Sequence, residues 1–532
     1  MSPGPPFTGA RAPGLWPWSA AQGPWQGGDG LPIPYSLTQA TFLPLAGAVL
    51  AYFLGGRLLR RIGWLAFALL SYSSLLLGLS YLEPAGGFPL LERFGWTSVP
   101  GLSFGLLGDG LSLPVALVMN VAAAAVAVYS MPYMARRMAA LYGEERGSFW
   151  GLYYANYLLF AAGLTGVALA TNLIELYIFV ELILIPAYLL LGLFGQVDRQ
   201  RIALMYFIWN QLGAFIFLAG ILVAWFGTRS FDIAALGALG GPLALLVTGL
   251  MLLGWLIKMA TFGFHVWLPF AYGEFPSSVA AISAITGLGS YVLTRLLVLN
   301  LYSSFQQLAH LIILLAVVTL LYGGALALAQ EDINRLYAWS TVSQTAYLLL
   351  GLASLSALGI AGSIFLFLAQ VLGKAVLFCV AGILVTQTGL RQMGRMGGYA
   401  ARMPLTALLA LGASLIISAV PPTLGFQGEW LLFTGLLGSA LYGPPFSLAL
   451  GFAALLGTML TVAYTLWAVK RIFFGPLSGE AGELSEAPKS MTLPLLALLA
   501  LALLLGIYPE PLLGPLYRYL ASALPSGLPL GG

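Results

Sequence analysis

Residues 242–262 read PLALLVTGLMLLGWLIKMATF, and this run decides the class of fold. About 20 apolar residues in a row are enough for an α-helix to cross the hydrocarbon core of a bilayer. The run also contains Lys258, and an ammonium group at membrane depth costs about 3 kcal/mol unless it is paired or hydrated. An ionisable residue in such a segment therefore marks a candidate functional position.

The whole chain has the composition of a membrane protein. Hydrophobic residues make up 60% of its 532 residues and charged residues 8%, whereas soluble domains carry about 25% charged residues. Apolar segments recur along nearly the whole length, which indicates membrane-crossing helices; a β-barrel would show short alternating segments instead. The composition therefore predicts an all-α polytopic membrane protein.

We predict fourteen transmembrane helices. Loop charges test this count, because fifteen Lys and Arg residues fall in loops on one side and five on the other. The five are Arg11, Arg93, Arg229, Arg295 and Arg518. By the positive-inside rule, this split places both termini outside the cytoplasm of a prokaryotic cell, whose inner or plasma membrane would hold the chain. The approximate spans are 36–55, 63–82, 110–130, 150–170, 172–194, 201–227, 242–262, 276–300, 306–329, 335–354, 357–386, 404–437, 446–469 and 490–508.

Two sets of five spans form candidate repeats. Because five is odd, the second copy enters the membrane from the opposite face, as in the inverted repeats of many transporters. Gly and Pro residues close to charges predict that helices seven and twelve are broken, at 258–269 and 421–429. The predicted organisation is an extracytoplasmic segment (1–35), helices one to three (36–130), a first repeat of helices four to eight (150–300), a second repeat of helices nine to thirteen (306–473), helix fourteen (490–508) and a C-terminal tail (509–532).

Four ionisable residues lie deep in these apolar segments: Glu181, Lys258, Lys374 and Glu429. We predict that Glu181 pairs with Lys258 and Lys374 with Glu429, because an unpaired buried charge is costly. Burial disfavours the charged form of both residue types, so a neighbouring charge that comes and goes would load and unload each lysine with a proton. The alternative in each half is a static ion pair that only joins two helices.

His265 is a candidate for passing protons between Lys258 and Lys374, since imidazole changes its charge near neutral pH. The alternative is a neutral histidine that bonds a carbonyl group of the broken helix. With two histidines and one cysteine, Cys379, in the sequence, we expect no metal site and no redox cofactor in this subunit. Its scattered arginines form no basic patch for nucleic acid.

Six motifs together give the chain a resemblance to a known family over roughly residues 100–475. The chain resembles the antiporter-like proton-channel subunits of respiratory complex I, of membrane-bound hydrogenases and of Mrp cation/proton antiporters. Glutamate at 429 and the short C-terminal tail make it most similar to the M-type subunit of complex I. The motifs are DGLSLP (109–114), NLIELYIFVELILIP (172–186), KMATFGFHVWLPFAYGEFPS (258–277), ALAQEDINRLYAWSTVSQ (327–344), LAQVLGKAVLF (368–378) and PPTLGFQGEW (421–430).

The resemblance implies a proton-translocating membrane subunit of a complex I-like NADH:quinone oxidoreductase, itself non-catalytic. Its partners would be lipid and other membrane-arm subunits, and its transported ion protons or sodium. In the family, the positions matching Glu181 and Lys258 form the ion pair of the first half-channel. The positions matching Lys374 and Glu429 belong to the second half-channel.

Three positions depart from the family pattern: Gly289 replaces a lysine, Gln370 a histidine and Phe270 an aspartate. If protons still cross between the halves, ordered water must take the place of the lysine near Gly289, with His265 and Gln370 as its anchors. Three alternatives stay open: a subunit of an Mrp-type Na+/H+ antiporter, the membrane arm of a hydrogenase, and a spacer that no longer conducts.

Overall fold

The computed structural model of the protein describes residues 33–82, 89–95, 103–143, 146–283, 285–439, 442–476 and 484–525. Nearly every described element is a helix, because an intact helix satisfies its own backbone polar groups in an apolar environment. The elements in chain order are α1 (Ser36–Leu58), η2 (Leu59–Arg61), α2 (Ile62–Leu82), β1 (Leu90–Phe94), β2 (Phe104–Gly108), α3 (Ser112–Tyr142), α4 (Gly147–Leu169), α5 (Leu173–Phe194), α6 (Arg199–Thr228), η3 (Ile233–Ala238), α7 (Gly241–Lys258), α8 (Trp267–Glu274), α9 (Ser277–Ile282), α10 (Ile285–Leu293), η4 (Thr294–Val298), α11 (Tyr302–Leu328), α12 (Ile333–Ala353), α13 (Ala357–Thr388), η5 (Met393–Arg395), η6 (Tyr399–Ala401), α14 (Pro404–Ile417), α15 (Leu424–Leu437), α16 (Pro444–Phe473), α17 (Lys489–Ile507) and α18 (Glu510–Ala523).

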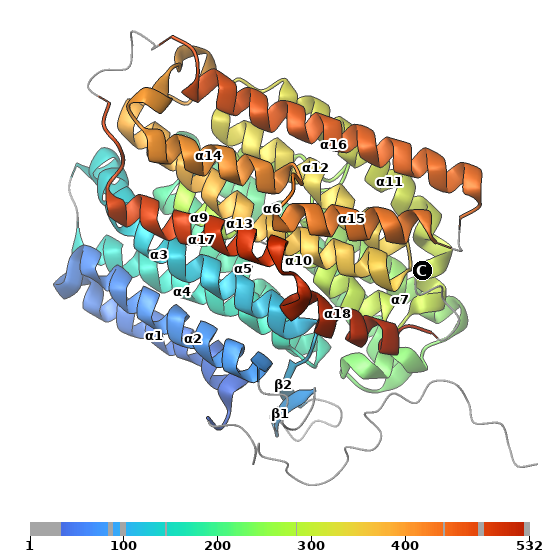
Figure 1. The fold of residues 1–532 in the computed structure, drawn as a ribbon. Helices are drawn as coiled ribbons and strands as arrows, with labels where there is room; N and C mark the ends of the chain where they lie inside the picture. The colour runs from blue at the N-terminus through green and yellow to red at the C-terminus, as the bar shows by residue number, and fades with distance from the viewer. Residues whose placement is uncertain are drawn as a thin grey trace, which may run out of the picture.

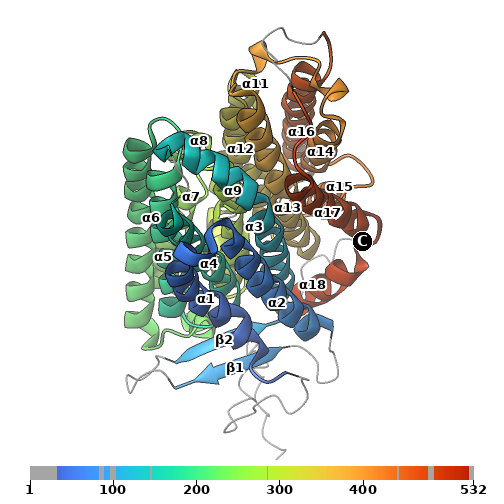
Figure 2. The ribbon, with the colours of Figure 1, turned by 90° about the vertical axis from the view of Figure 1, so that its left-hand side faces the viewer.

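Eleven helical stretches among the described residues are long and apolar enough to cross a membrane. The predicted class, a polytopic helical membrane protein, is confirmed by these stretches. Two of the predicted spans, 36–55 and 63–82, fall in one stretch, Ser36–Leu82, whose helices α1 and α2 pack side by side (Figure 2). The total of fourteen transmembrane helices stays a prediction.

Two elements differ from the predicted all-α organisation. The antiparallel hairpin β1–β2 lies between α2 and α3, where its strands satisfy each other's backbone groups. The predicted C-terminal tail contains the amphipathic helix α18, whose Leu512, Leu516 and Leu520 are buried at helical spacing. The predicted segment 1–35 lies, except for residues 33–35, outside the described residues.

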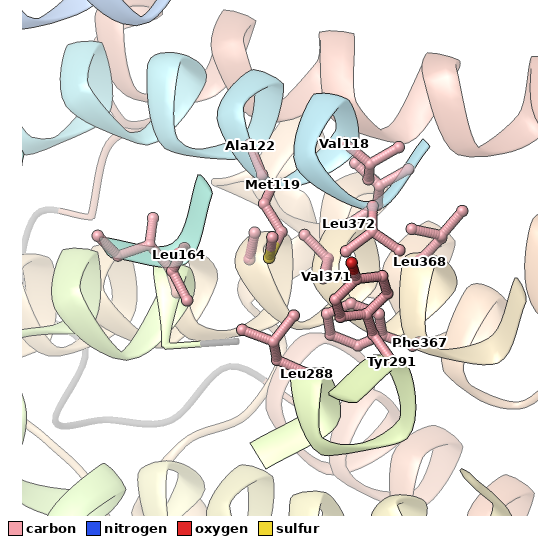
Figure 3. Packing of buried hydrophobic residues seen from close by; sticks show 14 of the residues in the cluster. Val118, Met119, Ala122, Leu164, Leu288, Tyr291, Phe367, Leu368, Val371 and Leu372 are labelled. Carbon is pink, nitrogen blue, oxygen red and sulfur yellow. The ribbon is translucent and has the colours of Figure 1, made fainter. Parts of the chain in front are cut away.

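Helix α13 forms the centre of the bundle. Its most apolar window is completely buried, and the helix contacts α3, α9, α12, α14, α15 and α17. In Figure 2, α5, α6 and α7 lie on one side of it, and α14 and α16 on the other. Figure 3 shows where the parts meet: Met119 of α3 and Leu288 of α10 face Phe367, Val371 and Leu372 of α13. The core therefore joins both candidate repeats to the first helices (Figure 1).

Glycines allow α13 and α15 to approach each other closely. A Cβ atom added at Gly362 would lie 2.4 Å from the backbone nitrogen of Leu432, and one at Gly428 would lie 2.7 Å from that of Leu366. Small residues at such crossings let helix backbones touch, as in many membrane proteins. The crossing fixes the position of the segment of α15 that carries Glu429, the residue after Gly428.

Both predicted breaks are present. Helix α7 ends at Lys258 and α8 begins at Trp267, whereas α14 ends at Ile417 and α15 begins at Leu424. Each break contains an alanine with positive φ, and the following residue donates its N–H to a carbonyl five residues back: Ala260 (φ 54°) with Thr261 to Leu256, and Ala419 (φ 51°) with Val420 to Leu415. Non-glycine residues rarely adopt this backbone region, so the shared geometry is a further likeness between the two breaks.

A third interruption was not predicted. The expected continuous span 276–300 consists of α9, α10 and η4, a π-helix, with a gap between α9 and α10. Ser283 follows α9 and donates its hydroxyl to Val279 instead of continuing the backbone pattern. The residues around this interruption are buried, and irregular backbone at membrane depth is tolerated only where protein covers it.

Each of the two candidate repeats contains one isolated β-bridge in a corresponding place. One pairs Asn172 with Asp232 and the other pairs Asp332 with Gln392. The second bridge follows the first at a constant offset: Asp332 lies as far along the chain from Asn172 as Gln392 lies from Asp232. The first residue of each bridge caps the helix that follows it, α5 or α12, with its side chain. These recurrences support the predicted repeats, which stay a prediction, as does their inverted relation.

Candidate functional site

Lys258 is the last residue of α7, and the break between α7 and α8 begins directly after it. Its side chain is 1% exposed. The Nζ atom donates to the backbone carbonyl of Asn210 on α6, 3.1 Å away. The end of α7 thus directs the ammonium group toward α6, where a carbonyl oxygen replaces part of its lost hydration.

Glu181 lies in the middle of α5 and is half-buried. Its Oε1 atom accepts from Nε2 of Gln211 on α6 at 3.4 Å. The predicted direct ion pair between Glu181 and Lys258 is wrong for this structure, since neither side chain forms an ion pair in the part of the chain that the structure describes. The reason is the position of α6, whose consecutive residues Asn210 and Gln211 each serve one of the two charges.

Lys374 lies in the central helix α13 and is 7% exposed. Its Nζ atom donates to the hydroxyl of Ser340 and to the carbonyl of Tyr337, 3.3 Å away, both on α12. Oxygen atoms of the neighbouring helix thus hold the lysine at membrane depth, and across the described ranges it has no carboxylate partner.

Glu429 lies in α15 and is also 7% exposed. Both of its oxygens accept from the hydroxyl of Thr458 on α16, at 3.1 and 3.2 Å. The predicted pair with Lys374 is therefore wrong as a direct contact. The lysine is directed to α12 and the glutamate to α16, so the two groups have separate hydrogen-bond partners.

His265 lies in the break between α7 and α8, inside a group of aromatic rings. Its ring centroid is 5.1 Å from that of Tyr322, 5.4 Å from Trp339 and 5.9 Å from Phe262. The buried Nδ1 atom has no hydrogen-bond partner among the described residues. The predicted transfer between the lysines therefore has no direct hydrogen bond to support it, whereas the backbone of Thr261, within the break, lies in hydrogen-bond contact with the imidazole, as the alternative predicts.

The space predicted beside Gly289 is filled by protein. A Cβ atom at this position would lie 2.5 Å from Cγ and Sδ of Met259, and 3.3 Å from Cε3 of Trp255. Ser290, the residue after Gly289, donates its hydroxyl to the carbonyl of Gly287 in its own helix. The prediction of a roomy polar site here is wrong, because α10 packs directly on the end of α7 and the glycine permits that close approach.

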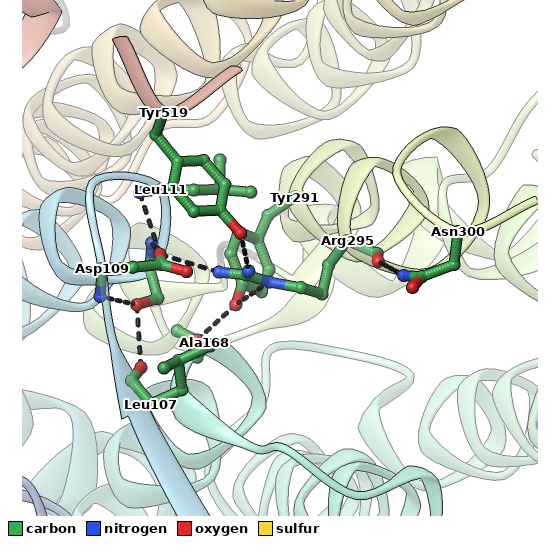
Figure 4. Close-up of polar contacts among 9 residues, drawn as sticks. Leu107, Asp109, Leu111, Ala168, Tyr291, Arg295, Asn300 and Tyr519 are labelled. Atoms are coloured by element: carbon green, nitrogen blue, oxygen red, sulfur yellow. Dashed lines mark hydrogen bonds and ion pairs between the residues drawn. The ribbon is translucent and has the colours of Figure 1, made fainter. Parts of the chain in front are cut away.

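Asp109 and Arg295 form a buried ion pair that the sequence did not reveal (Figure 4). The loop charges predict Arg295 in an outer loop, which is wrong: it lies in the π-helix η4 with its side chain 7% exposed, 2.8 Å from Asp109. Its guanidinium also donates to the hydroxyl of Tyr519 on α18, at 2.6 Å. The pair thus ties the start of α3 to η4 and to the C-terminal helix.

The carboxyl of Asp109 stays ionised in this setting. Burial opposes its charge, but the Arg295 guanidinium and the N–H groups of Ser112 and Leu111 hold the pKa of Asp109 below its usual range. Removing one partner would leave an uncompensated buried charge.

Polar residues that were not predicted as partners form hydrogen bonds with the candidate ionisable groups. Asn210 and Gln211 interrupt the apolar run of α6, and Ser340 does the same in α12. A polar residue inside an apolar span was the available signal, because it costs free energy unless it has a buried partner. Across the described residues, no group of three or more His, Cys, Asp and Glu side chains is placed to hold a metal ion.

Comparison with known proteins places this arrangement in a family. Residues 170–461 match the family described as NADH:quinone oxidoreductase/Mrp antiporter, transmembrane part. NAD(P)H-quinone oxidoreductase chain 4 2 of Thermosynechococcus vestitus is 31% identical over 89% of both chains. Chain 4-2 of the same enzyme from Synechocystis sp. is 33% identical over 82% of this chain and 78% of the relative.

Solved structures show the same fold. Respiratory complex I from Thermus thermophilus with bound NADH contains a chain that matches 93% of this chain and 100% of its own length, with a TM-score of 0.79 and 27% identity. A chain of the Mrp complex from Dietzia sp. matches with a TM-score of 0.80 at 22% identity, which shows a shared fold alone. The chain belongs to the NADH:quinone oxidoreductase/Mrp antiporter family of multi-pass membrane proteins.

Proposed function

We propose that this chain is a proton-translocating membrane subunit of a complex I-like NAD(P)H:quinone oxidoreductase. One observation carries the proposal: Lys258, Lys374 and Glu429 are buried at membrane depth, and each is held by an oxygen or hydroxyl of a neighbouring helix instead of an opposite charge. A charge without a fixed counter-ion responds to nearby charges and exchanges its proton more readily than one locked in an ion pair.

The first half of the path is built around Lys258. The carbonyl of Asn210 accepts a hydrogen bond from its Nζ atom, and Gln211 in turn binds Glu181. At low dielectric, a charge acts over several ångströms without contact. A change of charge at Glu181 therefore alters the proton affinity of Lys258 across α6, and the lysine gains or releases a proton in response.

The second half contains Lys374 and Glu429. Ser340 accepts a hydrogen bond from the lysine, and Thr458 donates one to the glutamate. Both groups face helices of the second candidate repeat, so a proton delivered to Lys374 has an acceptor, Glu429, within the same half. The redox chemistry belongs to other subunits, which supply the energy through a change of charge or conformation.

The proposal also covers the partner subunits of this chain and the side of the membrane on which its termini lie. The relatives named above are chains of multi-subunit complexes, so other membrane-arm subunits are the partners we propose. The charge split between loops supports both termini on the extracytoplasmic side. No cofactor is needed on this chain for the proposed transfer.

Isolation of the intact complex through a tag on this subunit tests the proposal. We expect quinone-reductase subunits to co-purify, and NAD(P)H oxidation by the complex in sealed vesicles to move protons, followed with a pH-sensitive dye in sodium-free buffer. Co-purification with antiporter subunits alone would support the Mrp alternative, and a nickel–iron subunit would support the hydrogenase. Quinone reduction without proton movement through this subunit would leave only a spacer.

A further inference from the structure

A face of buried polar side chains runs along α12, between the two ionisable groups of the second half. Ser340, Gln344 and Tyr347 follow one another at intervals of four and three residues, which places them on one side of the helix. They are 0%, 2% and 0% exposed. Three polar residues in line on a membrane helix are costly unless they have partners on a neighbouring helix.

The partners lie on α16. Thr458, Thr461 and Thr465 are spaced three and four residues apart and so share one face of that helix. Nε2 of Gln344 donates to the hydroxyl of Thr461 at 3.2 Å, and the hydroxyls of Tyr347 and Thr458 are 3.1 Å apart. The two polar faces therefore run side by side.

The ends of this double row meet the two ionisable groups. At one end Lys374 donates to the hydroxyl of Ser340. At the other, Thr458 donates to both oxygens of Glu429. Between the contacts, one helical turn separates Ser340 from Gln344, and one separates Thr461 from Thr458.

A structural role alone accounts for only part of these contacts. Thr461 donates to the carbonyl of Gly457, a bond within its own helix that satisfies a buried threonine without any neighbour. The bonds from Gln344 and Tyr347 cross between helices, and the row ends at Lys374 and Glu429. Hydroxyl groups both donate and accept, so each can take up a proton on one side and release its own on the other.

We propose that protons pass between Lys374 and Glu429 along the hydroxyls of Ser340, Thr461, Thr458 and Tyr347. Gln344 holds Thr461 in line, and water bridges the two one-turn gaps, where polar partners are at hand. Each step breaks one O–H or N–H bond and forms another, so every hydroxyl keeps one proton while Lys374 loses a proton and the carboxylate of Glu429 gains one. This route rests on the proposed function and adds the path within its second half.

The test exchanges the hydroxyl of Thr461 without changing the shape of the side chain. Thr461→Val removes the hydroxyl, and Thr461→Ser keeps it. We expect Thr461→Val to slow proton translocation by the assembled complex in vesicles about tenfold, because a hydrogen-bonded step of the path is lost. Thr461→Ser should stay close to the wild-type rate.

Thr345→Val is the matched control. Thr345 is a fully buried threonine of α12 whose hydroxyl donates to Val342 in its own helix, away from the row. We expect its variant to translocate protons normally. Tyr347→Phe removes only a hydroxyl from the row and should behave like Thr461→Val, which keeps the test decisive if Thr461→Val fails to assemble.

Two results would overturn the route. Normal translocation by both Thr461→Val and Tyr347→Phe would show that protons do not use these hydroxyls. A loss in Thr461→Ser as large as that in Thr461→Val would show that packing, not the hydroxyl, matters. If Lys374→Ala lowers translocation in either case, the proposed function survives and the route alone fails; if Lys374→Ala is normal, the proposed function itself fails.

Discussion

Replacing Lys374 with alanine is expected to lower the rate of proton translocation by the assembled complex about tenfold or more. Lys374 lies in the fully buried central helix, and its Nζ atom is held by oxygen atoms of Ser340 and Tyr337. No other lysine of the chain lies in this half at membrane depth, because Lys470 and Lys489 lie at the ends of α16 and α17. Water cannot supply the positive charge that the variant lacks.

Lys489→Ala is the control for this experiment. Lys489 is exposed at the start of α17, so its loss should leave translocation unchanged. The rate is measured in sealed vesicles, normalised to the content of this subunit and of its partners. A normal rate in Lys374→Ala, with the complex intact, would remove the second half from the path.

Lys258→Ala is expected to have an effect of similar size, about tenfold or more, because the variant leaves the first half without its cation. Glu181→Gln should lower the rate less. Glu181 is half-buried and binds Gln211, so its loss leaves the bond between Lys258 and the carbonyl of Asn210 in place. A direct ion pair would instead make the two losses alike, since either would strand an unpaired buried charge.

A double-mutant cycle distinguishes these cases. The cycle compares the two single variants with the double variant Glu181→Gln/Lys258→Ala and yields the coupling between the two residues. We expect a measurable coupling that is smaller than that of a direct pair, because the charge of Glu181 acts on Lys258 across α6 without contact. Equal losses in both single variants, with no further loss in the double variant, would point to a direct pair formed during turnover.

The helical class and the two breaks were predictable because both depend on local sequence. Long apolar runs specify membrane helices, and the Gly and Pro residues near Lys258 and Glu429 mark where a helix cannot continue. The first break lies within the predicted range 258–269, whereas the second begins before the predicted range 421–429 and ends where α15 starts at Leu424. The same alanine geometry occurs in each. The interruption after α9 has no comparable signal, since its serine, Ser283, is ordinary in a membrane helix.

The partners of the buried charges were not predictable in the same way. Which side chain Lys258 or Lys374 reaches depends on how α6 and α12 sit beside it, and that arrangement is tertiary. Asn210 and Ser340 were visible in the sequence as polar residues inside apolar spans, yet nothing local connects either to a lysine. Opposite charge alone was therefore a poor guide to contact.

Contacts between residues far apart in the chain were not predictable for the same reason. Arg295 was counted among loop cations because its partner, Asp109, lies far away in the chain. Gly289 suggested empty space because glycine has no side chain, but Met259 from the end of α7 fills the volume. In both cases the neighbour that decides the environment comes from a different helix.

The central claim is that protons pass through the buried groups of this subunit. The most direct test counts the protons moved per two electrons by the complex in sealed vesicles, with wild-type subunit and with Lys258→Ala/Lys374→Ala, at matched subunit content. We predict a lower ratio, or a matching loss of electron transfer if the two processes are tightly coupled. An unchanged ratio together with unchanged electron transfer would contradict the account, because protons would then be moving without these groups.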